Sequence, residues 1–98
     1  MTTNKSIEPK LVKISEELQV GYGSLFGKSR KHYFVRIRYC VWYYLNKILE
    51  YEHKEIASLF NKDHSTIGYG IRQAGFRKEN YNDYKTIYRT IKRIFEAL

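Results

Sequence analysis

Apolar residues recur at helical spacing along most of the chain, and this restricts it to one class of fold. The clearest run is close to the C-terminus: Tyr84, Ile87, Tyr88, Ile91, Ile94, Phe95 and Leu98. A stripe with this period is typical of an amphipathic helix, and no stretch keeps the two-residue alternation of a strand. The only proline is Pro9, so no later helix loses a backbone donor to proline. The pattern predicts an all-α fold.

Glycines and short polar turns divide this pattern into about six helical segments. We expect them at residues 8–19, 24–27, 32–49, 52–60, 64–76 and from 82 or 83 to the end. Gly21 and Gly23 would end the first segment, and Ser6 would cap it. Residues 1–6 are polar and are predicted to be flexible. Because 98 residues give room for one modest core, residues 7–98 are predicted to form a single domain.

Positive charge is concentrated in one part of the chain. The net charge is +8, and residues 18–49 contain no Asp or Glu. The basic residues in that window are Lys28, Arg30, Lys31, Arg36, Arg38 and Lys47. A surface that only needs solubility usually mixes both signs. The placement therefore indicates a polyanionic partner, with nucleic acid favoured over a membrane surface.

No membrane or export signal is visible in the sequence. No apolar run approaches membrane-spanning length, and no signal-peptide pattern follows the first residues. The single cysteine, Cys40, has no internal partner for a disulfide and fits a reducing compartment. We therefore expect a cytoplasmic protein.

Motifs that resemble catalytic or nucleotide sites fail on their spacing. A phosphate-binding loop requires a glycine five residues before Gly27-Lys28, and Tyr22 occupies that position. Asp63-His64-Ser65 are adjacent on a helix start, so they point in different directions and cannot form a triad. The histidines lack the spacing of metal ligands. We expect no enzymatic activity, nucleotide, cofactor or metal.

Residues 52–76 have the organisation of a helix-turn-helix motif. Two helical patterns flank the polar turn 61–63, and Asp63 is suited to cap the second helix. The first turn of such a helix enters the DNA major groove. There Asp63, His64 and Ser65 could contact base edges, and Thr66 could donate to a phosphate. Tyr69 and Arg72, one and two turns later, would face the DNA backbone.

One face of the helix predicted at 32–49 has two interpretations. Its core stripe contains Phe34, Ile37, Val41, Tyr44, Leu45 and Ile48. The opposite face contains Arg36, Tyr39, Tyr43 and Lys47. That face is either an ordinary solvated surface or a basic, aromatic surface lying along a nucleic acid.

Two motifs resemble the C-terminal DNA-binding domain, domain IV, of the bacterial replication initiator DnaA. The stretch IASLFNKDHSTI, residues 56–67, is similar to that family's signature. GKSRK, residues 27–31, is similar to its basic loop, and Arg30 and Arg38 keep the family's spacing of two arginines. The order of the predicted helices also agrees with the family, so the resemblance covers about nine-tenths of the chain. It implies a DnaA domain IV or Trp repressor-like fold and a bacterial or phage-encoded origin.

The resemblance implies a role for each matching residue. Arg30 would enter the minor groove, and Asp63, His64 and Ser65 would read bases in the major groove. Arginine favours narrow A·T-rich minor grooves because their potential is more negative. Phosphate contacts would come from Thr66, Arg38, Lys28, Lys31, Lys47, Lys54, Lys62, Tyr69 and Arg72.

The chain also departs from the family pattern. Ser65 stands where threonine is usual, so contact with a thymine methyl is lost and the sequence preference would change. Tyr39 replaces a common glutamine. Gly68 and Gly70 each weaken a helix by roughly 1 kcal/mol relative to alanine, which predicts a recognition helix that becomes firm only on DNA.

Taken together, these features predict a free-standing regulator of replication or transcription. It would bind double-stranded DNA as a monomer at short A·T-rich sites like those of DnaA, called boxes below. The alternatives are a protein-interaction module or an RNA-binding domain that keeps the fold without box recognition.

Overall fold

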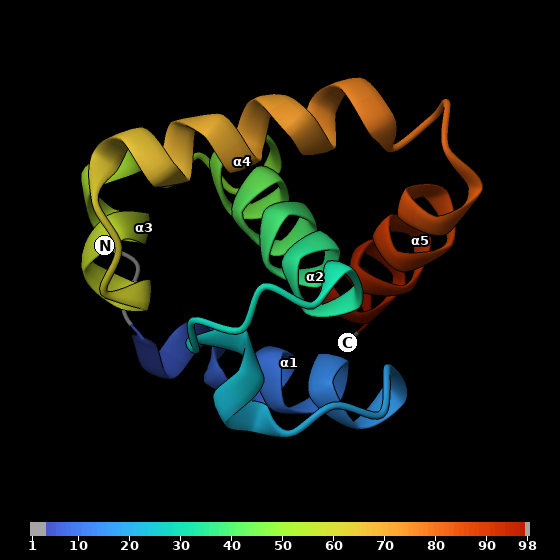
Figure 1. Cartoon of the computed structure of the whole chain (residues 1–98). Coiled ribbons are helices and arrows are strands. Elements are labelled where there is room, and N and C mark those ends of the chain that lie inside the picture. The colour runs from blue at the N-terminus through green and yellow to red at the C-terminus, as the bar shows by residue number, and fades with distance from the viewer. Residues whose placement is uncertain (1–3, 98) are drawn as a thin grey trace.

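The computed structural model describes residues 4–97, and every regular element among them is helical (Figure 1). In chain order these are α1 (Asn4–Glu17), η1 (Tyr22–Leu25), α2 (His32–Tyr43), η2 (Tyr44–Ile48), α3 (His53–Phe60), α4 (His64–Arg77) and α5 (Asn82–Glu96). The predicted all-α fold and helix order are confirmed. The short second segment is the 3-10 helix η1, and the end of the predicted long helix is the π-helix η2.

The first helix differs from its predicted bounds at both ends. It begins at Asn4 rather than at residue 8, with Pro9 inside it. Its end is set by Gln19, which has a φ of 60°, and the Val20 amide donates to the Ser15 carbonyl. A residue in the left-handed conformation, followed by an amide that bonds back to the last turn, is a common way for a helix to end. Here Gln19 takes the place that glycine usually has. The predictions for residues 1–3 and Leu98 concern positions outside the described residues.

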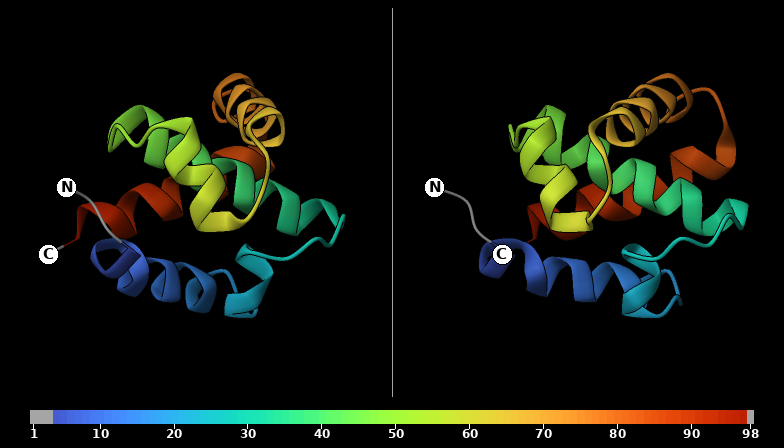
Figure 2. Two further views of the ribbon diagram at one scale, coloured as in Figure 1. Left: turned by 90° about the vertical axis from the view of Figure 1, so that its left-hand side faces the viewer. Right: turned by 60° about the vertical axis from the view of Figure 1, so that its left-hand side comes forward.

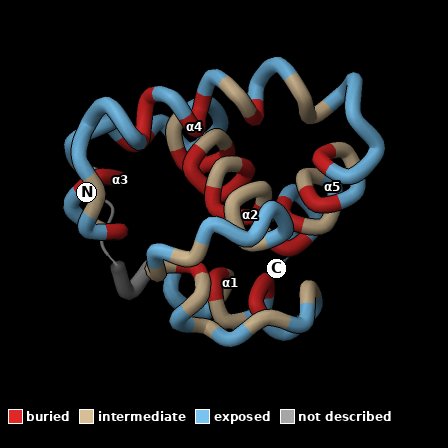
Figure 3. Tube along the Cα trace, in the orientation of Figure 1, coloured by how far each residue is buried: buried red, intermediate tan, exposed pale blue. Residues whose placement is uncertain are grey.

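Helix α2 is the centre of the core, with α4 on one side and α5 on another (Figures 1 and 2). Figure 3 shows its inner face buried along most of its length. Trp42, Val41 and Leu45 are almost completely shielded from solvent. Ile48 was assigned to the core stripe, and this is wrong, since it is 48% exposed. Leu49 donates to the Tyr44 carbonyl, five residues back, so the wider π turn shifts the stripe out of phase.

The face of α2 opposite the core stripe is partly covered by α4. Tyr39 and Tyr43 pack against the core, and α4 crosses them closely. A Cβ atom on Gly70 would lie 2.6 Å from the Tyr39 ring and 2.7 Å from the Trp42 ring. The glycine therefore allows the two helix backbones to approach. Tyr43 lies beneath α4, so neither interpretation describes it, whereas Tyr39 is half-buried and also lines open hollows on the surface. Lys47 alone of the four residues is fully exposed.

Helix α5 covers the core from the other side and holds α1. Lys10 Nζ donates to the carbonyls of Ile94 and Ala97, at 3.1 Å and 2.5 Å. Arg93 pairs with Glu17 at 2.6 Å. These contacts join the start and the end of the domain, whose helices lie side by side in both views of Figure 2. None of the described helices is long and apolar enough to cross a membrane.

Candidate nucleic-acid interface

Helices α3 and α4 are joined by a turn whose geometry the sequence specifies. Glu52 and Glu55 form a reciprocal capping box at the start of α3. Asn61 ends that helix in a left-handed conformation, with a φ of 55°, and the Lys62 amide donates to the Ala57 carbonyl. Asparagine tolerates this conformation better than most residues. The chain then turns at once into α4, which gives the helix-turn-helix predicted from the sequence.

Asp63 caps α4, as its position predicted. Its Oδ1 atom accepts the Thr66 amide at 2.8 Å and the Ser65 hydroxyl at 3.0 Å. The hydrogen bond from the Thr66 backbone is the main reason why the pKa of Asp63 is lowered. His64, Ser65 and Thr66 are exposed in the first turn. The cap therefore orders the side chains predicted to read DNA.

Replacing Asp63 with alanine is expected to lower the melting temperature at neutral pH, because the Thr66 amide loses its acceptor. A carboxyl whose pKa is lowered by folding stabilises the protein above its unfolded pKa. That contribution is lost as the pH falls through the folded value. Thermal unfolding of both proteins should show a difference that shrinks as the solution is acidified below the ordinary carboxyl range. A difference independent of pH would contradict a capping role for the carboxylate.

Residues 27–31, which lie between η1 and α2, form the basic loop. Arg38 reaches this region from α2: its Nε donates to the Ser24 carbonyl of η1 at 3.1 Å, and its Nη1 donates to the Ser29 carbonyl of the basic loop at 2.9 Å. Its side chain is buried, which lowers the pKa of the guanidinium. Its Nη2 atom has no hydrogen-bond partner among the described residues. Arg38 was predicted as a phosphate contact, and here it fixes the loop that carries Arg30.

The basic loop and the helix-turn-helix turn lie side by side, as both views in Figure 2 show. Lys62 Nζ, from the turn, donates to the Gly27 carbonyl at 2.8 Å. The pKa of Lys62 is lowered by burial and then by the nearby charges of Arg38 and Lys28. Two segments far apart in the sequence thus meet in one positively charged region.

Residues of both segments line an open hollow on the surface, with a volume of about 470 Å³. We call it the basic hollow. It brings together these residues that the sequence had singled out: Lys28, Arg30, Arg38, Lys62, Asp63 and Thr66. Arg30 is exposed at its edge. Such a concave, cationic site suits a phosphate group.

The remaining predicted residues lie outside the basic hollow. Lys47 is exposed on η2 and does not line the hollow. Lys54 is exposed at the start of α3, 3.6 Å from Glu52. Arg72 lies on the exposed side of α4, beside Gly68. Lys31, His64 and Ser65 are exposed near the hollow without lining it.

Sequence reasoning missed a second hollow, next to the first. Tyr69 and Arg30 line it together with Arg36 and Arg77, and its volume is about 330 Å³. Tyr69, Gln73 and Arg77 recur every four residues on α4. This spacing places them on one face of the helix, and it could have indicated the hollow from the sequence. Arg36 is partly neutralised by Asp83 at 3.1 Å, so Arg30 and Arg77 supply most of the positive charge of this hollow.

An aromatic contact beneath the basic loop was also missed. The rings of Phe26 and Phe60 are stacked, with centroids 4.9 Å apart and planes at 19°. Phe26 directly precedes Gly27 of the basic loop, and Phe60 directly precedes Asn61 of the turn. The apolar residue before each polar segment was the only sequence signal. The stack gives the two charged segments a common support.

Comparisons with known proteins agree with this geometry. A family model described as "Bacterial dnaA protein helix-turn-helix" matches residues 11–74. Two proteins named "Chromosomal replication initiator protein DnaA", from two strains of Leptospira biflexa serovar Patoc, are each 29% identical over 79 residues. These matches cover 81% of this chain, which spans only 18% of the length of each relative. No solved structure matches the chain.

Proposed function

The chain belongs to the bacterial DnaA helix-turn-helix family, and on this premise we propose that it reads short A·T-rich boxes in double-stranded DNA. The observation that carries the proposal is the basic hollow between the basic loop and the first turn of α4. In this arrangement α4 enters the major groove and Arg30 enters the adjacent minor groove. One sugar-phosphate strand separates two such grooves, so it must pass over the hollow.

The residues around the hollow have side chains suited to these tasks. His64 and Ser65 are exposed for contacts with base edges. Asp63 orients them through its bond to Thr66 and offers a carboxylate that could accept from cytosine. Lys28, Arg38, Lys62 and Thr66 would hold the phosphates of the strand that crosses the hollow. Lys31, Lys47, Lys54, Tyr69 and Arg72 would contact the backbone to either side.

The biological role proposed here is regulation in the bacterial cytoplasm. The relatives are named as initiators, but this chain matches only 18% of their length. Acting as a monomer at one asymmetric site, it would compete with other proteins for that box and so regulate replication or transcription.

Titration of labelled duplexes tests the proposal. One duplex carries an A·T-rich initiator-type box and the other carries the same bases in scrambled order. We expect tighter binding to the box and a log–log salt slope of roughly −4 to −7, from about five to eight phosphate contacts. Equal and weak binding to both duplexes would overturn box reading and favour a protein-interaction module. Tighter binding to a structured RNA would favour the RNA alternative.

A further inference from the structure

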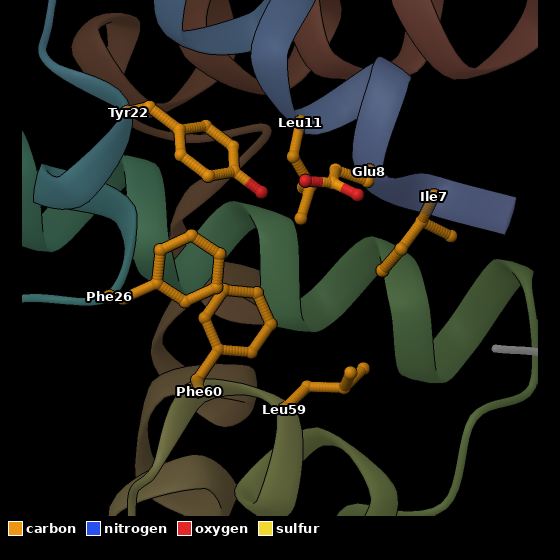
Figure 4. A pocket seen from close by; sticks show the side chains of 7 residues that line it. All are labelled: Ile7, Glu8, Leu11, Tyr22, Phe26, Leu59 and Phe60. Atoms are coloured by element: carbon orange, nitrogen blue, oxygen red, sulfur yellow. The ribbon is translucent and has the colours of Figure 1, made fainter. Parts of the chain in front are cut away.

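A cavity lies between α1, η1 and α3, away from the basic hollow (Figure 4). Its walls are the apolar side chains of Ile7 and Leu11 from α1, Leu59 and Phe60 from α3, and Phe26 after η1. Its volume is about 120 Å³. The cavity opens to solvent on one side, so a ligand has a path of entry.

The polar groups of the cavity are two oxygen-bearing side chains. Figure 4 shows the Glu8 carboxylate and the Tyr22 hydroxyl directed toward the same space. Burial, and then the charge of Glu8, raise the pKa of Tyr22, which agrees with the closeness of the two groups. Among the residues whose side chains the structure describes, no Lys, Arg or His lines this cavity, although the chain has a net charge of +8. The cavity is therefore a locally acidic site in a basic protein.

Volume and charge together define the ligand that fits. A dry cavity of about 150 Å³ lined by Leu, Ile and Phe accepts benzene, so this smaller space suits one ring or one branched alkyl group. A carboxylate beside it favours a cation and rejects an anion. We propose that the cavity binds a small apolar cation, an aromatic or branched alkyl group that carries an ammonium.

The position of the cavity gives such a ligand a route to the DNA surface. The stacked rings of Phe26 and Phe60 form part of its wall, and the basic loop and the turn begin at the next residues. A ligand that contacts these rings touches the support of both segments. This consequence for DNA rests on the function proposed above, whereas ligand binding is measured without DNA and fails or succeeds independently.

Benzylammonium is the probe that tests the site. In an NMR titration of the whole chain, we expect saturable shifts of the methyl groups of Ile7, Leu11 and Leu59, with a dissociation constant in the millimolar range. Benzoate, which has the same ring and the opposite charge, should leave these methyl groups unchanged. The proposal is overturned if benzylammonium causes no saturable shift, or if benzoate binds equally well.

Two substitutions separate the charge from the cavity. Glu8→Gln should weaken benzylammonium binding about threefold, since a partly exposed ion pair contributes modestly, and should leave benzyl alcohol binding unchanged. Glu16→Gln, an exposed acid on the same helix that does not line the cavity, is the matched control. Leu59→Phe should fill the space and abolish binding of both probes. Equal losses in the Glu8 and Glu16 variants, or shifts that persist in a folded Leu59→Phe protein, would contradict the assignment.

Discussion

Gly70→Ala is expected to lower the free energy of unfolding by about 2 kcal/mol, although alanine is the better helix former. The helix propensity of alanine would contribute about 1 kcal/mol in its favour. Against this, the new Cβ would meet ring atoms of Tyr39 and Trp42 at 2.6 to 2.8 Å. The Trp42 ring is fully buried and cannot move aside. Overpacking of this kind costs roughly 1–3 kcal/mol or more, so the steric cost exceeds the gain.

Gly68→Ala is the matched control, two residues earlier on the same helix. A Cβ there would lie 3.5 Å from Arg72 and 3.9 Å from His53, which is ordinary contact. We expect this variant to be more stable by up to about 1 kcal/mol. Urea unfolding followed by circular dichroism measures both changes. If both variants gain stability, the close crossing of α4 over α2 is not a real constraint.

Arg30→Ala is expected to weaken binding to the box duplex by roughly 10- to 100-fold, as for the loss of a specific arginine contact. Arg30 is exposed, and the loop that carries it is held by Arg38 and Lys62. The fold should therefore be unchanged. Binding to the scrambled duplex should fall less, because only the general electrostatic attraction is reduced there.

Arg89→Ala is the control for charge alone. Arg89 is exposed on α5 and lines neither hollow near the helix-turn-helix. This variant loses the same unit of charge and should bind the box almost as well as the unchanged protein. Fluorescence anisotropy at one fixed salt concentration compares the two variants. Equal losses would show that the DNA lies on a different face from the one proposed.

The sequence was sufficient to predict the features that depend on neighbouring residues in the chain. Helix order followed from apolar spacing, and the Asp63 cap followed from its position before the first turn of α4. Tertiary packing decided the features that were missed. Periodicity shows that α2 has a second face, but it cannot show that α4 covers Tyr39 and Tyr43 on that face. Nor can it show that Gly70 is required by a close crossing rather than tolerated as a weak point.

The sequence identified many residues of the candidate site, but it did not show how they are arranged in space. Arg30, Lys62 and Thr66 were each singled out, yet the hydrogen bond that joins the loop to the turn spans 35 positions in the chain. Spacing alone does not reveal such a contact. The phosphate contact predicted for Arg38 stays a prediction, but the burial of this side chain depends on the loop that folds over it, which spacing does not reveal.

The Phe26–Phe60 stack and the Lys62–Gly27 bond have a consequence for how DNA is recognised. They make the basic loop and the turn one preorganised body, so little conformational entropy would be lost if the protein engages both grooves as proposed. They would also couple the two proposed DNA contacts energetically, because a disturbance of either ring would displace both the loop and the turn. Substitutions at Phe26 and at Phe60 should therefore be strongly non-additive in their effect on DNA affinity. Major-groove and minor-groove reading would be acquired or lost together as a single property of this fold.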